Sequence, residues 1–140
     1  MKNIYEVFDE FELVKNKKDR LDVIQRNLSK TLVDVLQLTF HPDYEWKVKE
    51  MPEDYKIVPV PSGMSRCQLS TEMRKLYLFL EGHPTAETLT DTRRHELLLQ
   101  LLESIEPREA EVVIGIFNKD QGVKGLDYKF VKEAFPDLLP

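Results

Sequence analysis

Hydrophobic positions along most of the chain recur at the spacing of amphipathic helices. In the first stretch the apolar side chains stand at i, i+3, i+4 and i+7, which places them on one helical face: Ile4, Val7, Phe8, Phe11 and Val14. The same period returns in runs that end near residues 26, 40, 80, 105, 117 and 135. The pattern predicts an all-α protein, with residues 1–140 forming a single compact domain of six or seven helices.

Residues with strong positional preferences mark the predicted helix ends. Asn16, Ser29 and Asp127 each stand just before an apolar-periodic run, where their side chains can accept a hydrogen bond from the first turn. Pro107 suits a first helical position, and acidic residues follow it in the first turn. Gly82 is a natural stop for the helix before it. These residues predict boundaries for five of the helices.

Residues 41–68 do not follow the helical period. Four prolines within residues 42–61 exclude a long helix there. The segment is not rich in glycine and serine, as a flexible linker would be. We therefore predict a long, ordered, proline-containing loop in the middle of the domain. Tyr44 and Trp46 are expected to anchor it on the core, and residues 55–58 are expected to form a short extended piece.

Composition narrows the class of protein. Apolar residues make up 41% and charged residues 32% of the 140 residues, which is typical of one globular domain. No apolar run approaches the ~20 residues of a membrane span, and the N-terminus lacks the apolar block of a signal peptide. One cysteine, Cys67, excludes an internal disulfide and fits a reducing compartment. We expect a cytoplasmic protein without a membrane partner.

Charge is unevenly distributed along the chain. The net charge is −5, whereas dedicated DNA-binding domains usually carry a basic excess because phosphate neutralisation supplies much of their affinity. Residues 15–30 nevertheless hold six basic residues against two acidic ones, and residues 87–111 hold seven acidic residues against three basic ones. The distribution indicates one basic end and one acidic stretch, or else two ordinary solvated helix faces.

The sequence offers no set of residues for catalysis or metal binding. His41, His83 and His95 have no histidine or cysteine partner at metal-ligand spacing. Cys67 has no adjacent base that would activate it. Neither the phosphate-binding GxxxxGK[ST] loop nor the GxSxG elbow is present. We expect a protein that is not an enzyme, with no catalytic residue, no metal, no cofactor and no small-molecule substrate.

Two glycines near the C-terminus suggest a phosphate contact. The stretch NKDQGVKGLDYKFVKEAFPDLLP places Gly122 and Gly125 between two predicted helices. Glycine allows the backbone to approach a ligand closely, and the start of the next helix has unpaired N–H groups. Lys119, Lys124 and Lys129 add positive charges. The alternative is an ordinary turn between helices, in which the nearby aspartates partly cancel the lysines.

The order of motifs carries a resemblance that favours the first interpretation. VKNKKDRLDVIQRN, LVDVLQLTFHPDYEWKVKEMPE and EVVIGIFNKDQGVKGLDYKFVKEAFPDLLP follow one another along nearly the whole chain. In this order they resemble the N-terminal all-helical DNA-binding domain of ATP-dependent DNA ligases of large tailed phages. The chain is also similar to small stand-alone phage proteins built from that domain. The resemblance implies a grip on the minor-groove backbone of duplex DNA and, for a viral source, the host cell cytoplasm.

The resemblance does not imply ligation. A ligase needs a nucleotidyltransferase domain with its adenylated lysine in a K-x-D-G motif, and the run from Lys124 to Asp127 has these residue types in another order. We therefore expect a non-catalytic, sequence-independent DNA-binding accessory protein of phage DNA metabolism. The expected phosphate contacts are Lys119, Gly122, Lys124, Gly125 and Lys129, with a second region of Lys15, Lys17, Lys18 and Arg20 if these share a face.

Net acidity and the acidic stretch leave a second hypothesis open. The chain would then be a protein-interaction module that docks on replication or transcription machinery and has no DNA affinity of its own.

Overall fold

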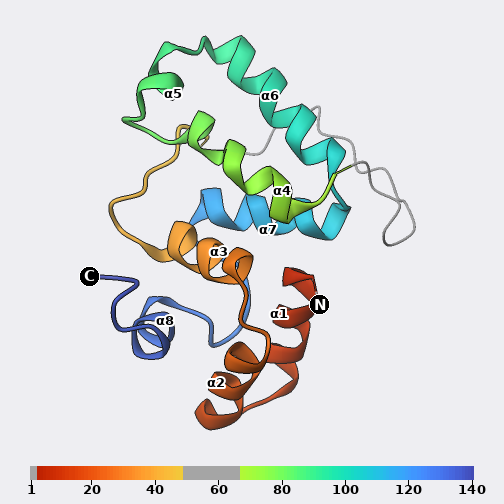
Figure 1. The fold of residues 1–140 in the computed structure, drawn as a ribbon, viewed down its shortest axis with the longest axis vertical. Helices are drawn as coiled ribbons and strands as arrows, with labels where there is room; N and C mark the ends of the chain where they lie inside the picture. Colours follow the sequence, from red (N-terminus) through yellow and green to blue (C-terminus); the bar gives the residue numbers. More distant parts are fainter. Residues whose placement is uncertain (1–2, 49–66) are drawn as a thin grey trace.

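The computed structural model describes residues 3–48 and 67–140, and within them the protein is all-helical (Figure 1). The prediction of an all-α fold is confirmed. The described elements are α1 (Ile4–Leu13), α2 (Lys17–Arg26), α3 (Lys30–Phe40), α4 (Leu69–Glu72), the 3-10 helix η1 (Met73–Phe79), α5 (Pro84–Thr88), α6 (Asp91–Ser104), α7 (Pro107–Asn118) and α8 (Tyr128–Ala134).

The described part of the chain thus holds eight α-helices and a 3-10 helix, where the sequence predicted six or seven helices. The predicted helix before Gly82 is divided into α4 and η1, because the chain tightens into 3-10 geometry after the first turn. The short helix α5 was not predicted, since five residues contain too few apolar positions to show a period. Its start has local signals, because Pro84 is in the first turn and His83 accepts a hydrogen bond from the Thr85 amide.

The predicted caps are confirmed. Asn16, Ser29 and Asp127 each accept a hydrogen bond from a backbone amide in the first turn of α2, α3 and α8. Pro107 begins α7, as predicted. Each cap satisfies an N–H group that has no partner within its helix, which sets the helix start by local chemistry.

The helix α7 is at the centre of the fold. It packs against α1, α3 and α6, and seven of its 12 residues are buried. Buried side chains from α1, α2, α3, α4, η1, α6, α7 and α8 join in one hydrophobic cluster. The helices therefore share a core, and α7 determines how the last turn and α8 are presented.

The loop after α3 is pinned to this core as predicted. Trp46 is 2% exposed and forms an isolated bridge with Leu80. Its ring meets the Phe117 ring edge-on, with centroids 5.3 Å apart. Tyr44 is partly buried against the same core. The extended piece predicted for residues 55–58 lies outside the described residues.

The helices are arranged along one long axis. In Figure 1, α4, α5 and α6 lie toward one end, α1, α2 and α8 toward the other, and α3 and α7 between them. Residues 15–20 and α8 therefore lie toward the same end of the molecule. A search of the described helices for a segment long and apolar enough to cross a membrane found none.

Candidate nucleic-acid interface

The turn between α7 and α8 uses positive backbone angles at three positions. Lys119 has φ +58° and caps α7, donating its amide to the carbonyls of Gly115 and Ile116. Gly122 and Gly125 have φ +68° and +87°. Glycine meets little steric resistance in this region, whereas a lysine there is uncommon. The two glycines are therefore required by the path of the backbone, whatever else they do.

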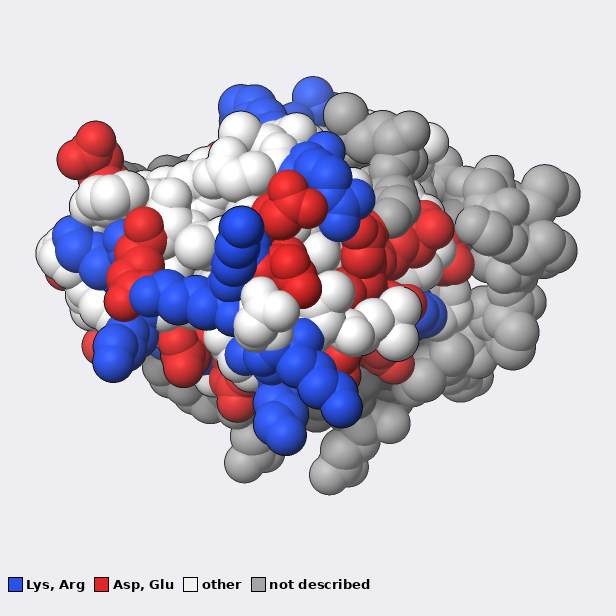
Figure 2. Space-filling model, turned by 90° about the horizontal axis from the view of Figure 1, so that it is seen from below, with Lys and Arg blue, Asp and Glu red and all other residues white. Residues whose placement is uncertain are grey.

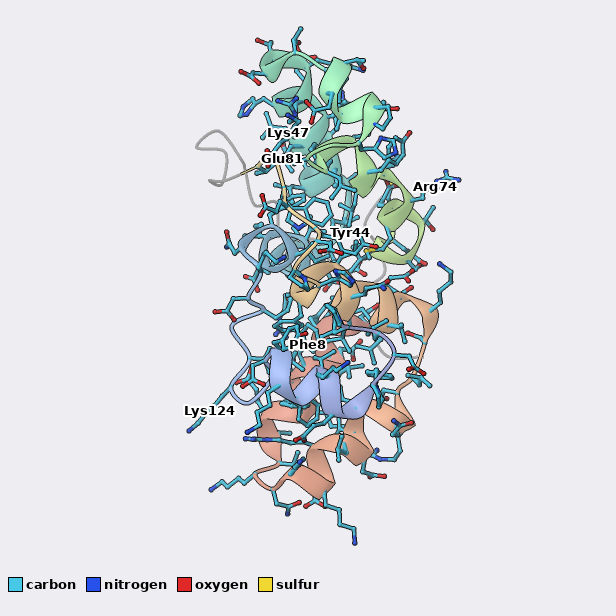
Figure 3. The ribbon with its side chains drawn as sticks, turned by 90° about the vertical axis from the view of Figure 1, so that its left-hand side faces the viewer. Phe8, Tyr44, Lys47, Arg74, Glu81 and Lys124 are labelled. Carbon is cyan, nitrogen blue, oxygen red and sulfur yellow. The ribbon has the colours of Figure 1, made fainter. Side chains whose placement is uncertain are left out.

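Buried anchors hold this turn in place. Val123 and Leu126 enter the core, at 9% and 3% exposure. The Gln121 amide donates to Thr39 Oγ1 at 3.0 Å and to an α7 carbonyl at 3.1 Å. Between the anchors, Lys124 extends away from the body of the molecule (Figure 3). The turn thus presents one lysine from a fixed backbone.

Lys119 is engaged inside the fold. Its ammonium donates to the backbone carbonyls of His41 and Tyr44, each at 2.7 Å. These bonds connect the end of α7 to the loop that follows α3. The sequence placed Lys119 among the phosphate contacts. Its geometry instead gives it a structural task, and the reason is tertiary, because His41 lies 78 positions away in the chain.

Three of the predicted contact residues, Lys17, Arg20 and Lys129, line one cleft of about 250 Å³ between the start of α2 and α8. We call it the α2–α8 cleft. The residues that line it are Lys17, Arg20, Asp127, Lys129, Phe130 and Glu133. Lys17 and Arg20, two of the four residues of the second predicted region, therefore share a face. Lys15 and Lys18 are exposed neighbours in the same stretch.

Arg20 has an unusual environment in this cleft. Its guanidinium lies over the Phe11 ring, 5.6 Å from the centroid, and Phe11 in turn contacts Phe130 edge-on. The Nε atom is buried without a hydrogen-bond partner among the described residues. A Cβ added at Gly125 would stand 2.5 Å from Nη1. The absence of a side chain at Gly125 thus makes the room in which the guanidinium lies.

Carboxylates moderate the positive charge of the cleft. Lys17 forms an ion pair with Glu133, and Asp127 Oδ1 accepts the Phe130 amide at 2.9 Å. The contact of Lys17 with Glu133 could not be predicted from the sequence, because it depends on how α8 packs beside α2. Seen end-on in Figure 2, lysines and arginines gather at this end of the molecule with acidic side chains between them.

Several exposed cations here have no ion pair or side-chain hydrogen bond with any described residue. They are Lys15, Lys18, Lys124 and Lys129. The start of α8, which the sequence offered as a source of unpaired N–H groups, is partly occupied, because its cap Asp127 takes one of them. The cations, rather than this helix start, are what the surface can present to an anion.

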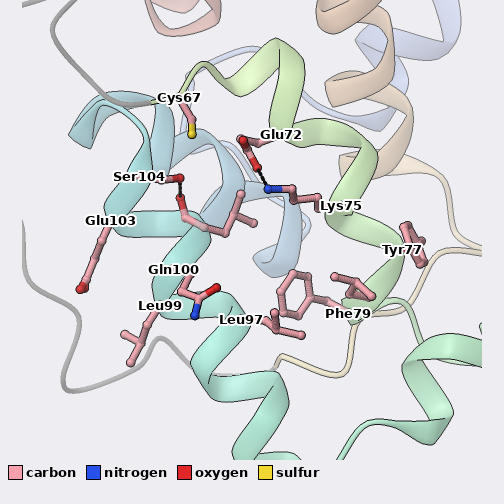
Figure 4. Close-up of a pocket in the computed structure, with 12 residues that line it drawn as sticks. Cys67, Glu72, Lys75, Tyr77, Phe79, Leu97, Leu99, Gln100, Glu103 and Ser104 are labelled. Atoms are coloured by element: carbon pink, nitrogen blue, oxygen red, sulfur yellow. Dashed lines mark hydrogen bonds and ion pairs between the residues drawn. The ribbon is translucent and has the colours of Figure 1, made fainter.

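A second cavity, of about 770 Å³, lies between η1 and α6 (Figure 4). Its polar end holds Glu72, a 4% exposed carboxylate that forms an ion pair with Lys75 at 2.7 Å. Burial alone would raise the pKa of Glu72, but the hydrogen bonds from Lys75 and Cys67 outweigh it and the pKa is lowered. The charges at this end satisfy one another, which distinguishes this cavity from the α2–α8 cleft.

Ion pairs engage several charged residues of the acidic stretch 87–111. Four of its ion pairs join residues of opposite charge: Lys47–Glu87, Arg94–Asp91, Arg93–Glu96 and Arg108–Asp9. Among the described residues there is no group of three histidine, cysteine or acidic side chains placed to hold a metal ion. The ion pairs leave the stretch with its excess of four acidic residues, because two pairs lie within it and the contact with Lys47 is offset by that with Asp9.

Fold and surface together define a small all-helical protein with a cluster of cations at one end. The chain belongs to a family of unknown function, DUF6433, whose model matches residues 7–123. The matched segment includes α2 and Gly122 but ends before Gly125 and α8. A comparison with curated proteins gave no match.

Proposed function

We propose that this protein is a non-catalytic accessory of phage DNA metabolism that binds the backbone of duplex DNA without reading its sequence. The observation that carries the proposal is that cations from two segments distant in the chain, Lys17 and Arg20 with Lys129, line the same α2–α8 cleft. The resemblance to phage ligase DNA-binding domains supports the same function and supplies the phage setting. Phosphate contacts hold a protein on DNA but carry no base information, which fits a surface of lysines and one arginine.

The proposed contact set follows from the cations that the fold leaves unpaired. It comprises Lys15, Lys18, Arg20, Lys124 and Lys129, with Lys17 joining when its ion pair opens. Gly122 and Gly125 contribute by shaping the backbone. Lys119 is left out because its ammonium already donates to two carbonyls.

This set predicts weak, salt-sensitive binding. If all five unpaired cations meet a phosphate, the slope of log K against log salt is about −4.5, and affinity falls roughly 10²- to 10³-fold between 50 and 200 mM salt. The net charge of −5 opposes association and lowers the affinity throughout.

The test is a fluorescence-anisotropy titration of a labelled duplex at several salt concentrations. Lys124→Ala should weaken binding equally on unrelated sequences and reduce the salt slope by about one. Arg74→Ala removes one positive charge from η1 and is the matched control, since Arg74 projects from another part of the surface (Figure 3). Absence of binding at ~50 mM salt, where phosphate contacts are strongest, would refute the function.

A further inference from the structure

The guanidinium of Arg20 is the least satisfied charged group of the α2–α8 cleft. Arginine stays charged in proteins, and a charge removed from water is costly unless it is paired. Arg20 has a buried, unbonded Nε, and none of the interactions of its side chain with the described residues is an ion pair. The buried Nε is closed to solvent, so an anion would bind at the terminal Nη1 and Nη2 atoms, which have no ion-pair partner among the described residues.

The residues around Arg20 preorganise its guanidinium for binding an anion. The Phe11 ring and the bare Cα of Gly125 both lie close to the guanidinium and restrict its movement. A restrained planar fork loses little freedom when it binds two oxygens of one group. This is the geometry by which arginine recognises phosphate and carboxylate.

The lining of the cleft carries a small excess of positive charge. The lining has three cations, Lys17, Arg20 and Lys129, against the carboxylates of Asp127 and Glu133. One positive charge therefore remains, which suits a singly charged anion, and the proposed function makes a phosphodiester its source. The cleft of about 250 Å³ has room for several waters at about 30 Å³ each, and so for a phosphate group.

Glu133 already occupies the cationic side of the cleft. It forms an ion pair with Lys17 although both side chains are well exposed, at 40% and 61%. Exposed pairs of this kind are weak and exchange readily with other ions. A phosphate that enters the cleft can therefore take Lys17 from Glu133.

We propose that the α2–α8 cleft is a discrete pocket for one phosphate group, in which Arg20 is the fixed ligand and Lys17 and Lys129 are movable ones. Glu133 is a resident carboxylate that phosphate displaces from Lys17. With DNA as the source of the phosphate, the inference rests on the proposed function and assigns its central contact. Inorganic phosphate has the same oxygen chemistry and is the other source that the pocket accepts.

The experiment follows the Nε–Hε resonance of Arg20 in the ¹⁵N-labelled full-length chain. Sodium phosphate is titrated at constant ionic strength against sodium chloride, and a short duplex without terminal phosphates forms a second arm. We expect a saturable shift of this resonance in both arms and none with chloride. Arg20→Lys keeps the charge but not the fork, and should weaken both ligands at least tenfold, with folding checked by thermal unfolding.

Glu133→Gln tests the resident carboxylate. Removing a competing charge at contact distance should tighten both ligands about threefold to tenfold. Glu103→Gln makes the same change of net charge beside the η1–α6 cavity and is the control, expected to stay within about twofold. If both variants gained the same affinity, the change in net charge alone would explain the effect. This result would overturn the role assigned to Glu133 as a competitor for Lys17.

The two arms separate failure of the pocket from failure of the function. Phosphate binding with no duplex binding would keep the pocket and refute the proposed function. Duplex binding that leaves the Arg20 resonance unmoved, with Arg20→Lys as tight as wild type, would keep the function and overturn the pocket. No response to either ligand overturns both.

Discussion

Lys119→Met separates a structural lysine from a phosphate-binding one. The Lys119 ammonium bonds two carbonyls at 2.7 Å each. After the substitution the His41 carbonyl still accepts the Tyr44 amide at 3.2 Å, whereas the Tyr44 carbonyl loses the lysine donor. One charged hydrogen bond is worth about 1.5–3 kcal/mol, and an unsatisfied partly buried carbonyl costs about 1–3 kcal/mol. Allowing for the ammonium's return to water, we expect a loss of about 2–3 kcal/mol.

This loss is measurable by calorimetry. A domain of 140 residues has an unfolding entropy for which 1 kcal/mol corresponds to about 3 °C in Tm, so Lys119→Met should unfold roughly 6–10 °C below wild type. Lys124→Met is the matched control, because Lys124 is exposed and should change stability by less than about 0.5 kcal/mol.

The two variants should behave in the opposite way toward DNA. Well below its lower Tm, Lys119→Met should keep the wild-type salt slope, while Lys124→Met should lose about one unit of it. A Lys119→Met protein with unchanged Tm and a smaller slope would show that our reading of the two hydrogen bonds is wrong and that Lys119 contacts phosphate.

Three further substitutions probe the packing that supports the site. Asp9→Asn breaks a bidentate ion pair with Arg108, at 2.6 and 2.7 Å. Because this pair lowers the pKa of Asp9, the variant should lose ~0.5–1 kcal/mol of unfolding free energy at pH values above the pKa of a free carboxyl. Urea titrations should show this loss vanish as pH falls through the folded-state pKa. Burial raises the pKa of Glu109, so the contribution of this residue to stability is complete at low pH and is lost as pH rises. Glu109→Gln should therefore have a higher Tm than wild type at pH 7 and lose that difference near pH 4. An equal difference at both pH values would contradict the raised pKa. Gly125→Ala should lower Tm by more than Gly122→Ala. Both positions have positive φ, but only at Gly125 would the new methyl group meet the Arg20 guanidinium, at 2.5 Å. Equal losses of Tm would mean that the guanidinium moves aside without cost.

Much of the helical framework could be predicted from the sequence, because its causes are local. Apolar spacing marked the helices, and Asn16, Ser29 and Asp127 marked where three of them begin, since a cap acts within one turn. The short helix α5 and the 3-10 geometry of η1 were not predicted, because a run of a few residues shows no period and tertiary packing decides its form.

The candidate site was predicted in part. The sequence identified the basic stretch of residues 15–30, the lysines of the turn and the two glycines, whose positive φ angles are confirmed. Which lysine faces outward was decided by tertiary structure. Lys119 and Lys124 have similar settings in the sequence, yet one reaches the loop after α3 and the other reaches solvent.

The sequence by itself therefore determined the class of fold, most helix boundaries and the position of the turn, because these depend on residues within a few positions of one another. Only the tertiary structure decided the cleft. Arg20 meets Gly125, and Lys17 meets Glu133, because α2 and α8 pack beside each other at one end of the molecule. Contacts between such distant residues depend on the burial of the whole core around α7, and no local pattern records them.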